Sequence, residues 1–249
     1  MSAVGLGRGG VPHVGGGAAA WYPTDSTSFE DFWDASVSGD FSLSGSNVIS
    51  WTGRRGTHVF TDLSNPARRP SISAAALNGN DAVLFNGITE WLNCSTIDMP
   101  APPFCYYMGF RYVTCTSFDV VMHSGSTAAM IGALYVTSTA ATSLTMANGT
   151  TVGPNAGLGT TGVWKRVYTN FYDNSGGNDE LLVGSTSATG SAGTTNAGAG
   201  LNMGARKGDA STFANIEMLF FGVAYESLSA PDLALMDAWV TSKYGSGLV

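Results

Sequence analysis

Carboxylate side chains are the first candidates for chemistry in this chain of 249 residues, because paired Asp or Glu residues carry out glycoside hydrolysis. Two adjacent pairs stand out, Glu30-Asp31 and Asp179-Glu180. Neighbouring residues on a strand point to opposite faces, so we expect neither pair to converge on one bond. The chain also has no Asp or Glu between Asp119 and Asp173. We therefore expect no carboxylate pair of the kind that retaining glycosidases use.

The histidines and serines also show no catalytic spacing. The histidines are His13, His58 and His123, and no Gly-x-Ser-x-Gly turn precedes a predicted helix. His123 follows the apolar run FDVVM, and we interpret it as a hydrogen-bonded residue at a strand end. Since the sequence has neither a triad nor a carboxylate pair, we expect that the protein is not an enzyme.

Metal ligands are sparse as well. Cys94, Cys105 and Cys115 form no C-x-x-C pair and have no histidine nearby, so the spacing predicts no zinc site. We interpret Cys105 and Cys115 as core thiols, with a disulfide as the alternative. The segment Asp173 to Asp179 carries oxygen ligands without the spacing of a calcium loop, and we interpret it as a hairpin turn, with a calcium ion as the alternative. We expect no cofactor.

Charge and hydropathy exclude two classes of partner. The net charge is −7 and only 11 residues are basic, which argues against nucleic acid as a ligand. We interpret the two densest basic clusters, Arg54-Arg55 and Arg68-Arg69, as solvated loop charges or ion pairs. The first twenty residues have no apolar stretch of a signal peptide, and no segment reaches membrane-spanning length. We expect a soluble protein without membrane contacts.

The composition predicts one domain of short strands and tight turns. The chain contains 33 Gly and only 12% charged residues. In WKRVYTNFY, alternation predicts a strand with Trp164 and Tyr168 on one face and Val167 and Phe171 on the other. The low-complexity segment 185–200 is predicted to be a long exposed loop. Further strands are expected near 48–52, 82–86, 104–113, 118–123, 129–136, 143–147, 180–184 and 201–204.

The C-terminal residues predict one amphipathic helix that follows an apolar strand at 216–225. Ser229 can cap the helix, and Pro231 and Asp232 suit its first turn. Gly245 offers a left-handed stop. The spacing predicts a helix over 230–244 that packs on the sheet through residues at helical spacing, namely Leu233, Met236, Trp239 and Val240.

Several short motifs occur in the order of a known family. The first is Trp33-Asp34-Ala35-Ser36, followed by Val48 and Trp51, and the last is Lys243-Tyr244-Gly245. Between them come Arg69-Pro70, Leu77-Asn78-Gly79, Val83 to Phe85, Gly87 and Trp91-Leu92. From Phe29 to its end, the chain resembles the laminin-G-like, concanavalin A-like lectin and glucanase domains of phage and bacterial surface proteins. The resemblance implies an all-β fold for residues 29–249, a two-sheet antiparallel jelly-roll sandwich with one C-terminal helix. The glucanases of this fold carry an E-x-D-x-E or E-x-D-x-x-E set that is missing here.

The first 28 residues are predicted to form an extended arm outside this domain. Glycines at 5, 7, 9, 10, 15, 16 and 17 make the segment costly to order by itself. We expect Gly5, Arg8, Val11 and His13 to contact a partner, with Arg8 suited to a carboxylate on an acidic shell protein.

Arm and domain together predict a structural virion protein of a tailed phage, most simply a capsid decoration protein on the particle exterior. Its expected partners are the major capsid protein or tail subunits and further copies of itself. The alternative is a glycan-binding module of a phage tail or cell-surface protein, which would bind a host surface glycan through residues that the sequence does not identify. A degenerate hydrolase is the third interpretation.

Overall fold

The computed structural model of the chain describes residues 21–56, 58–62, 65–115, 118–124, 130–136, 143–149, 152–158, 160–172, 178–193, 198–206 and 212–248. The predicted arm contacts Gly5, Arg8, Val11 and His13 lie outside the described residues, as do residues 173–177 of the predicted hairpin turn. Within the described residues the fold is all-β, with 17 strands in one hydrogen-bonded network and a single α-helix close to the C-terminus. Every pairing between named strands is antiparallel.

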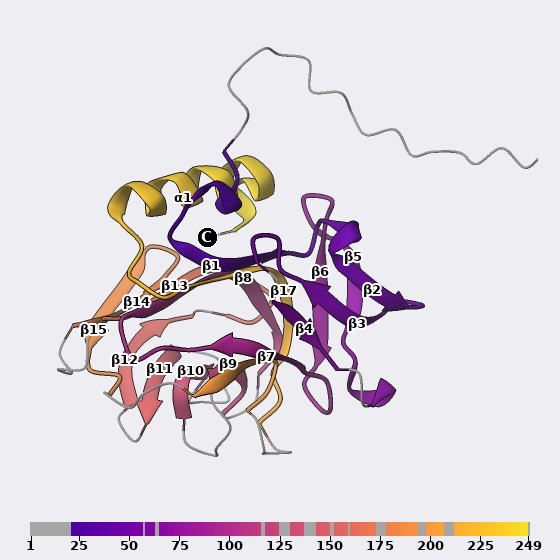
Figure 1. The fold of residues 1–249 in the computed structure, drawn as a ribbon, viewed down its shortest axis with the longest axis horizontal. Helices are drawn as coiled ribbons and strands as arrows, with labels where there is room; N and C mark the ends of the chain where they lie inside the picture. Colours follow the sequence, from indigo (N-terminus) through magenta and orange to yellow (C-terminus); the bar gives the residue numbers. More distant parts are fainter. Residues whose placement is uncertain are drawn as a thin grey trace, which may run out of the picture.

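The strands form two groups that face each other (Figure 1). The first group contains β1 (Phe29–Asp34), β5 (Ser71–Leu77), β6 (Asn80–Asn86), β8 (Phe104–Thr114), β13 (Lys165–Phe171), β14 (Asp179–Val183), β15 (Thr186–Gly190) and β17 (Asn215–Ala224). The second contains β2 (Phe41–Ser44), β3 (Asn47–Thr52), β4 (Val59–Thr61), β7 (Leu92–Asp98), β9 (Val120–Ser124), β10 (Met130–Val136), β11 (Ser143–Gly149), β12 (Val152–Gly157) and β16 (Ala199–Met203). Helix α1 spans Ala230–Tyr244, and four 3-10 turns cover Pro23–Asp25 (η1), Ser38–Asp40 (η2), Pro66–Arg68 (η3) and Gly245–Gly247 (η4).

The two groups are joined into a nearly closed, barrel-like sheet. On one side, a single pairing of Asn47 with Ser71 links β3 to β5. On the other side, the backbone N–H of Asn148 in β11 donates to the carbonyl of Ala192 just after β15, at 2.5 Å. The strands therefore do not form two separate sheets. Their hydrogen bonds run almost all the way round one barrel-like sheet. Closure of this kind removes exposed strand edges, which would otherwise pair with other chains.

Side-chain alternation divides the apolar residues of the first group of strands into an interior and an outer cluster. Along β8, Tyr106 and Met108 belong to the interior cluster between the groups, whereas Cys105 and Tyr107 belong to the cluster on the outer side. The alternation predicted for 164–172 is confirmed, because Val167 and Phe171 lie in the interior, and Trp164 and Tyr168 lie outside. Both faces of this group are apolar because each face is covered by another layer.

Helix α1 covers the outer cluster and matches the predicted helix over 230–244 (Figure 1). The Ser229 side chain accepts a hydrogen bond from the N–H of Asp232, and Gly245 ends the helix with φ 67°. Trp239 is 9% exposed, and its ring lies 5.3 Å from that of Phe220 and 5.4 Å from that of Phe32. No helix of the described part has the length and hydropathy needed to cross a bilayer.

One sequence expectation about local structure needs correction. The predicted loop over 185–200 contains strand β15, which pairs along its whole length with β14. The strand reads TSATG, and apart from its two threonines these residues have little strand propensity, so the pairing with β14 decides its conformation. Cys105 and Cys115 are thiols in the described structure, as the core-thiol interpretation expects. Cys105 is fully buried in the outer cluster, where burial raises its pKa to about 12, and Cys115 is partly buried against the interior cluster.

The carboxylate of Asp34 ties helix α1 to strand β1. Asp34 is fully buried and pairs with the ammonium group of Lys243. Its Oδ2 accepts a hydrogen bond from the Tyr22 hydroxyl at 2.6 Å, and its Oδ1 accepts bonds from the hydroxyl of Ser36 at 2.8 Å and of Tyr244 at 3.4 Å. The first and last motifs of the family resemblance therefore meet at one carboxylate.

The surroundings of Asp34 favour its charged form. Burial by itself would raise its pKa, but the Lys243 charge and the hydrogen bonds from Lys243, Tyr22 and Ser36 lower the pKa overall. A buried ion pair contributes little net stability, yet removing one member leaves the other charge desolvated, at a cost of about 3–5 kcal/mol.

Replacing Trp239 with Ala is expected to lower the free energy of unfolding by about 3–5 kcal/mol, since the ring is buried among other aromatic rings. The matched control is Leu235→Ala on the same helix, where the side chain is 41% exposed and the loss stays below about 1 kcal/mol. Urea denaturation followed by circular dichroism measures both. Equal losses in the two variants would contradict the burial of Trp239.

Asp34 also predicts how stability depends on pH. Because its folded pKa lies below the ordinary value of about 3.9, its contribution is fully present above that value and is lost as pH falls through the folded pKa. Asp34→Asn should therefore destabilise by about 3–5 kcal/mol at pH 7 and by progressively less toward pH 2. Asp40→Asn, which affects a looser pair with Arg54 at 3.6 Å, is the control. The measurement is the denaturant midpoint of each protein between pH 2 and 7. A difference between wild type and Asp34→Asn that stays the same at every pH would refute this role.

Candidate functional site

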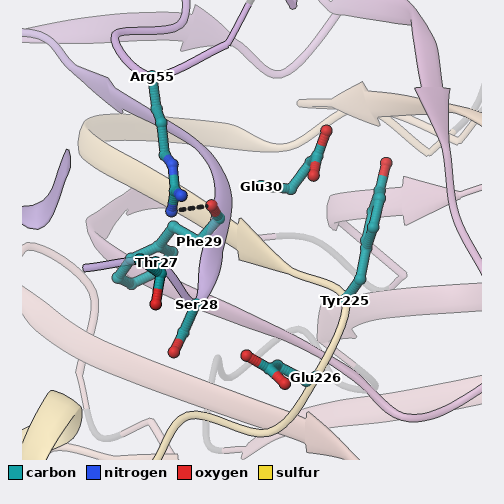
Figure 2. A pocket seen from close by; sticks show the side chains of 7 residues that line it. All are labelled: Thr27, Ser28, Phe29, Glu30, Arg55, Tyr225 and Glu226. Atoms are coloured by element: carbon teal, nitrogen blue, oxygen red, sulfur yellow. Dashed lines mark hydrogen bonds between the residues drawn. The ribbon is translucent and has the colours of Figure 1, made fainter. Parts of the chain in front are cut away.

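A polar pocket of about 280 Å³ lies where the start of β1 meets the end of β17. Figure 2 shows the Arg55 side chain on one side of it, and the Glu30 carboxylate and the Tyr225 ring on the other. The pairing of Phe29 with Ala224 brings these distant segments together. The lining residues are Thr27, Ser28, Phe29, Glu30, Arg55, Tyr225 and Glu226.

One wall of the pocket is organised around Asp31, which is fully buried. Its Oδ1 accepts hydrogen bonds from the backbone N–H groups of Arg55 at 2.9 Å and Gly56 at 3.2 Å. Its Oδ2 accepts from the N–H of His58 at 3.3 Å. A carboxylate held by successive backbone amides is a strong, charge-assisted arrangement. Asp31 therefore shapes the loop over 53–58 that carries Arg55 and His58.

Gly53 makes room for this arrangement. A Cβ atom at position 53 would lie 2.1 Å from Oδ2 of Asp31, so no larger residue fits without moving the carboxylate. The strict alternation expected for Glu30 and Asp31 is interrupted here, because the register of β1 against β17 shifts between Phe29 and Asp31. Both carboxylates consequently contact the same loop.

The Arg55 and Glu30 side chains are held by different partners. The Arg55 guanidinium donates to the backbone carbonyls of Ser26 and Phe29 (Figure 2 draws the Phe29 bond). Oε1 of Glu30 lies 3.0 Å from Nε2 of His58, whose Nδ1 lies 3.0 Å from the hydroxyl of Thr96. These contacts restrain two polar side chains before any ligand arrives.

Tyr225 supplies a ring and a hydroxyl group at the far side of the pocket. Burial, followed by the nearby charge of Glu30, raises its pKa to about 12. The hydroxyl therefore stays protonated at physiological pH and can donate a hydrogen bond.

The pocket combines donors and acceptors within a small volume. Ser28 and Thr27 have hydroxyl groups, and Glu226 adds an exposed carboxylate. Ser28 is itself positioned by helix α1, because its hydroxyl donates to Oδ2 of Asp232 at 3.1 Å. The arrangement suits a small ligand with several hydroxyl groups.

The other sequence candidates lie elsewhere. Asp179 accepts backbone hydrogen bonds from Tyr172 at 2.8 Å and Ala192 at 2.6 Å, which fasten the β14–β15 region. Glu180 lies on β14, which does not pair with β1, so the two carboxylate pairs remain on separate strands. His123 is buried in β9, where its carbonyl accepts a hydrogen bond from Asn202 at 3.4 Å. Among the described residues, no three His, Cys, Asp or Glu side chains gather as a metal site.

The sequence did not identify the lining of the pocket. Arg54 forms the expected type of ion pair, with Asp40 at 3.6 Å, but its neighbour Arg55 lines the pocket. In the sequence, Glu30 stands out only as half of a carboxylate pair, and Tyr225 only as the end of an apolar strand. Glu30 and Glu226 lie far apart in the sequence, and only the pairing of β1 with β17 brings them together. No local pattern in the sequence indicates this pairing.

Comparison with protein-family models and with curated protein sequences gives no match. Solved structures do match. A Trypanosoma rangeli sialidase in complex with 2,3-difluorosialic acid is 13% identical, with a TM-score of 0.59 over 94% of this chain and 35% of the sialidase chain. The same sialidase with sialic acid gives a TM-score of 0.57 at 13% identity, over 92% of this chain and 35% of that chain. A binding domain of botulinum neurotoxin serotype D/C is 9% identical, with a TM-score of 0.48 over 79% of this chain and 52% of that domain.

These comparisons correct the expectation that the protein is not an enzyme. The chain spans about a third of the sialidase chains and shares its fold with that part of them, at 11–13% identity. Likeness at this level shows the fold alone. The architecture thus occurs within enzyme chains, and the missing glucanase motif does not exclude catalysis.

Replacing Gly53 with Ala is expected to destabilise the protein by about 1–3 kcal/mol, because the new methyl group would collide with the Asp31 carboxylate. Gly39→Ala is the control, since a Cβ atom there meets nothing within 4 Å. Urea denaturation of both variants compares the losses. A Gly53→Ala protein as stable as Gly39→Ala would mean that Asp31 does not organise this loop.

Proposed function

We propose that this protein is a carbohydrate-binding module with a lectin-like β fold, and that the pocket between β1 and β17 is its sugar site. The observation that carries the proposal is the set of restrained polar groups around the pocket. Glu30 and Arg55 are held by neighbouring residues, and Tyr225 offers both a ring and a neutral hydroxyl.

Sugars match these groups because each hydroxyl of a sugar both donates and accepts hydrogen bonds. Carboxylates such as Glu30 and Glu226 accept from hydroxyl groups, while the Tyr225 hydroxyl donates. Its ring offers an apolar surface to the C–H face of a sugar. The volume of 280 Å³ lies near the lower end of ligand pockets, about 300 Å³, which suits one sugar ring. The sialidase structures with bound sialic acid support sugars as the class of ligand.

We propose further that the two groups of strands correspond to the two sheets of a jelly roll. The interior apolar cluster, which collects residues from both groups, supports this assignment. A sandwich of this kind places strand ends and their loops together, and the pocket lies at such strand ends.

The place of the module on a phage virion is also a proposal. Trp21 and Tyr22 pack against the outer cluster beneath α1, so a partner held through the preceding residues would attach on the helix side of the domain. The chemistry of Arg8 and the other arm residues supports attachment to a capsid or tail protein.

Tyr225→Ala is expected to weaken sugar binding at least about tenfold, a change of about 1.4 kcal/mol, since it removes both the ring and the hydroxyl donor. A glycan array identifies the ligand, and isothermal titration calorimetry measures its affinity for wild type and variant.

The matched control for this experiment is Glu90→Gln. Glu90 accepts a bond from the N–H of Asn86, which pairs with Asn215 at the opposite end of β17 from Tyr225. Ten strand residues place these ends about 30 Å apart. The proposal fails if no glycan binds, or if Tyr225→Ala binds its glycan as tightly as Glu90→Gln does.

A further inference from the structure

Negative charge dominates the pocket between β1 and β17. Two carboxylates line it, Glu30 and Glu226, together with a single cationic side chain, Arg55. Asp31 lies directly behind the loop, and Asp232 bonds the lining residue Ser28. More carboxylates than cations therefore surround a bound ligand.

The one lining cation is engaged in the structure. The Arg55 guanidinium donates to the carbonyls of Ser26 and Phe29, and the backbone N–H of Arg55 binds Asp31. These bonds direct the guanidinium to the backbone. A ligand carboxylate would have to compete with them for a bidentate contact, which is the usual way that Arg recognises carboxylates.

The carboxylates keep much of their charge available to a ligand. Glu226 is exposed and forms no ion pair within the described part of the chain. Glu30 contacts His58, which adds a positive charge only when it is protonated. Figure 2 shows both glutamates beside the Tyr225 side of the pocket, away from Arg55.

We propose that this pocket selects sugars without a negative charge and prefers those with a protonated amine. The inference rests on the proposed carbohydrate-binding function and adds the class of sugar. An ammonium group gains attraction from Glu30 and Glu226, a neutral hydroxyl group gains hydrogen bonds, and a sugar carboxylate meets repulsion. Although sialidases share the fold, the charge of this pocket opposes an acidic sugar such as sialic acid.

The test compares matched oligosaccharides by isothermal titration calorimetry at pH 7, with low and with physiological salt. The probes are glucosamine oligomers, N-acetylglucosamine oligomers, sialyllactose and galacturonic acid oligomers. We expect the amine-bearing sugar to bind most tightly and the two acidic sugars at least tenfold more weakly than the neutral one. Physiological salt should reduce these differences, because dissolved ions weaken the interaction between a charged sugar and solvent-exposed carboxylates.

Glu226→Gln provides the decisive variant, because an exposed side chain can lose its charge without loss of the fold. It should shrink the affinity ratio of amine-bearing to acidic sugar at least fivefold, whereas Glu90→Gln, near the start of β17, should leave the ratio unchanged. Thermal melting confirms that both variants are folded.

The possible outcomes separate the two proposals. Acidic sugars that bind as tightly as neutral ones, or a ratio that Glu226→Gln leaves unchanged, would overturn the charge selection while sugar binding stands. No binding of any probe or of any glycan on an array would overturn the carbohydrate-binding function and the selection with it.

Discussion

A single buried carboxylate, that of Asp34, connects the parts of this protein that lie farthest apart in the sequence. It accepts hydrogen bonds from Tyr22 before β1, from Ser36 after β1 and from Tyr244 at the end of α1, and it pairs with Lys243. A charge in this position is costly unless every one of these partners is in place. The contact therefore requires the helix, strand β1 and the segment at Tyr22 to assemble together. It supports specificity of the arrangement more than it adds net stability.

A second buried carboxylate, Asp31, acts in the same way on a smaller scale. It lies on the same strand as Asp34, but its partners are backbone amides of the loop over 53–58. Strand β1 thus carries one carboxylate that places the helix and another that places Arg55 beside the pocket. The position of β1 against β17 consequently controls both the packing of the outer layer and the shape of the candidate site.

The fold and the site support different levels of conclusion about function. The fold is shared with part of a sialidase chain, which establishes an architecture that also occurs in enzymes. The lining of the pocket comes from the start of β1 and the turn before it, from the turn after β17 and from the loop that carries Arg55. Its excess of carboxylates over cations distinguishes it from a site for acidic ligands. The proposed class of ligand therefore rests mainly on the side chains of the pocket, because likeness at this identity shows the fold alone.

The sequence by itself determined those features that depend on local pattern. The helix over 230–244, its cap at Ser229 and its stop at Gly245 follow from residue types and 3.6-residue spacing, and the two faces of β13 follow from alternation. Only the tertiary structure decided the features that depend on pairing between distant segments. Strand β15 forms because β14 lies beside it, the two groups of strands close into one network, and Glu30 meets Glu226 because β1 pairs with β17. The physical reason is that β pairing joins residues without regard to their separation along the chain, so the contacts that build the pocket leave no local pattern in the sequence.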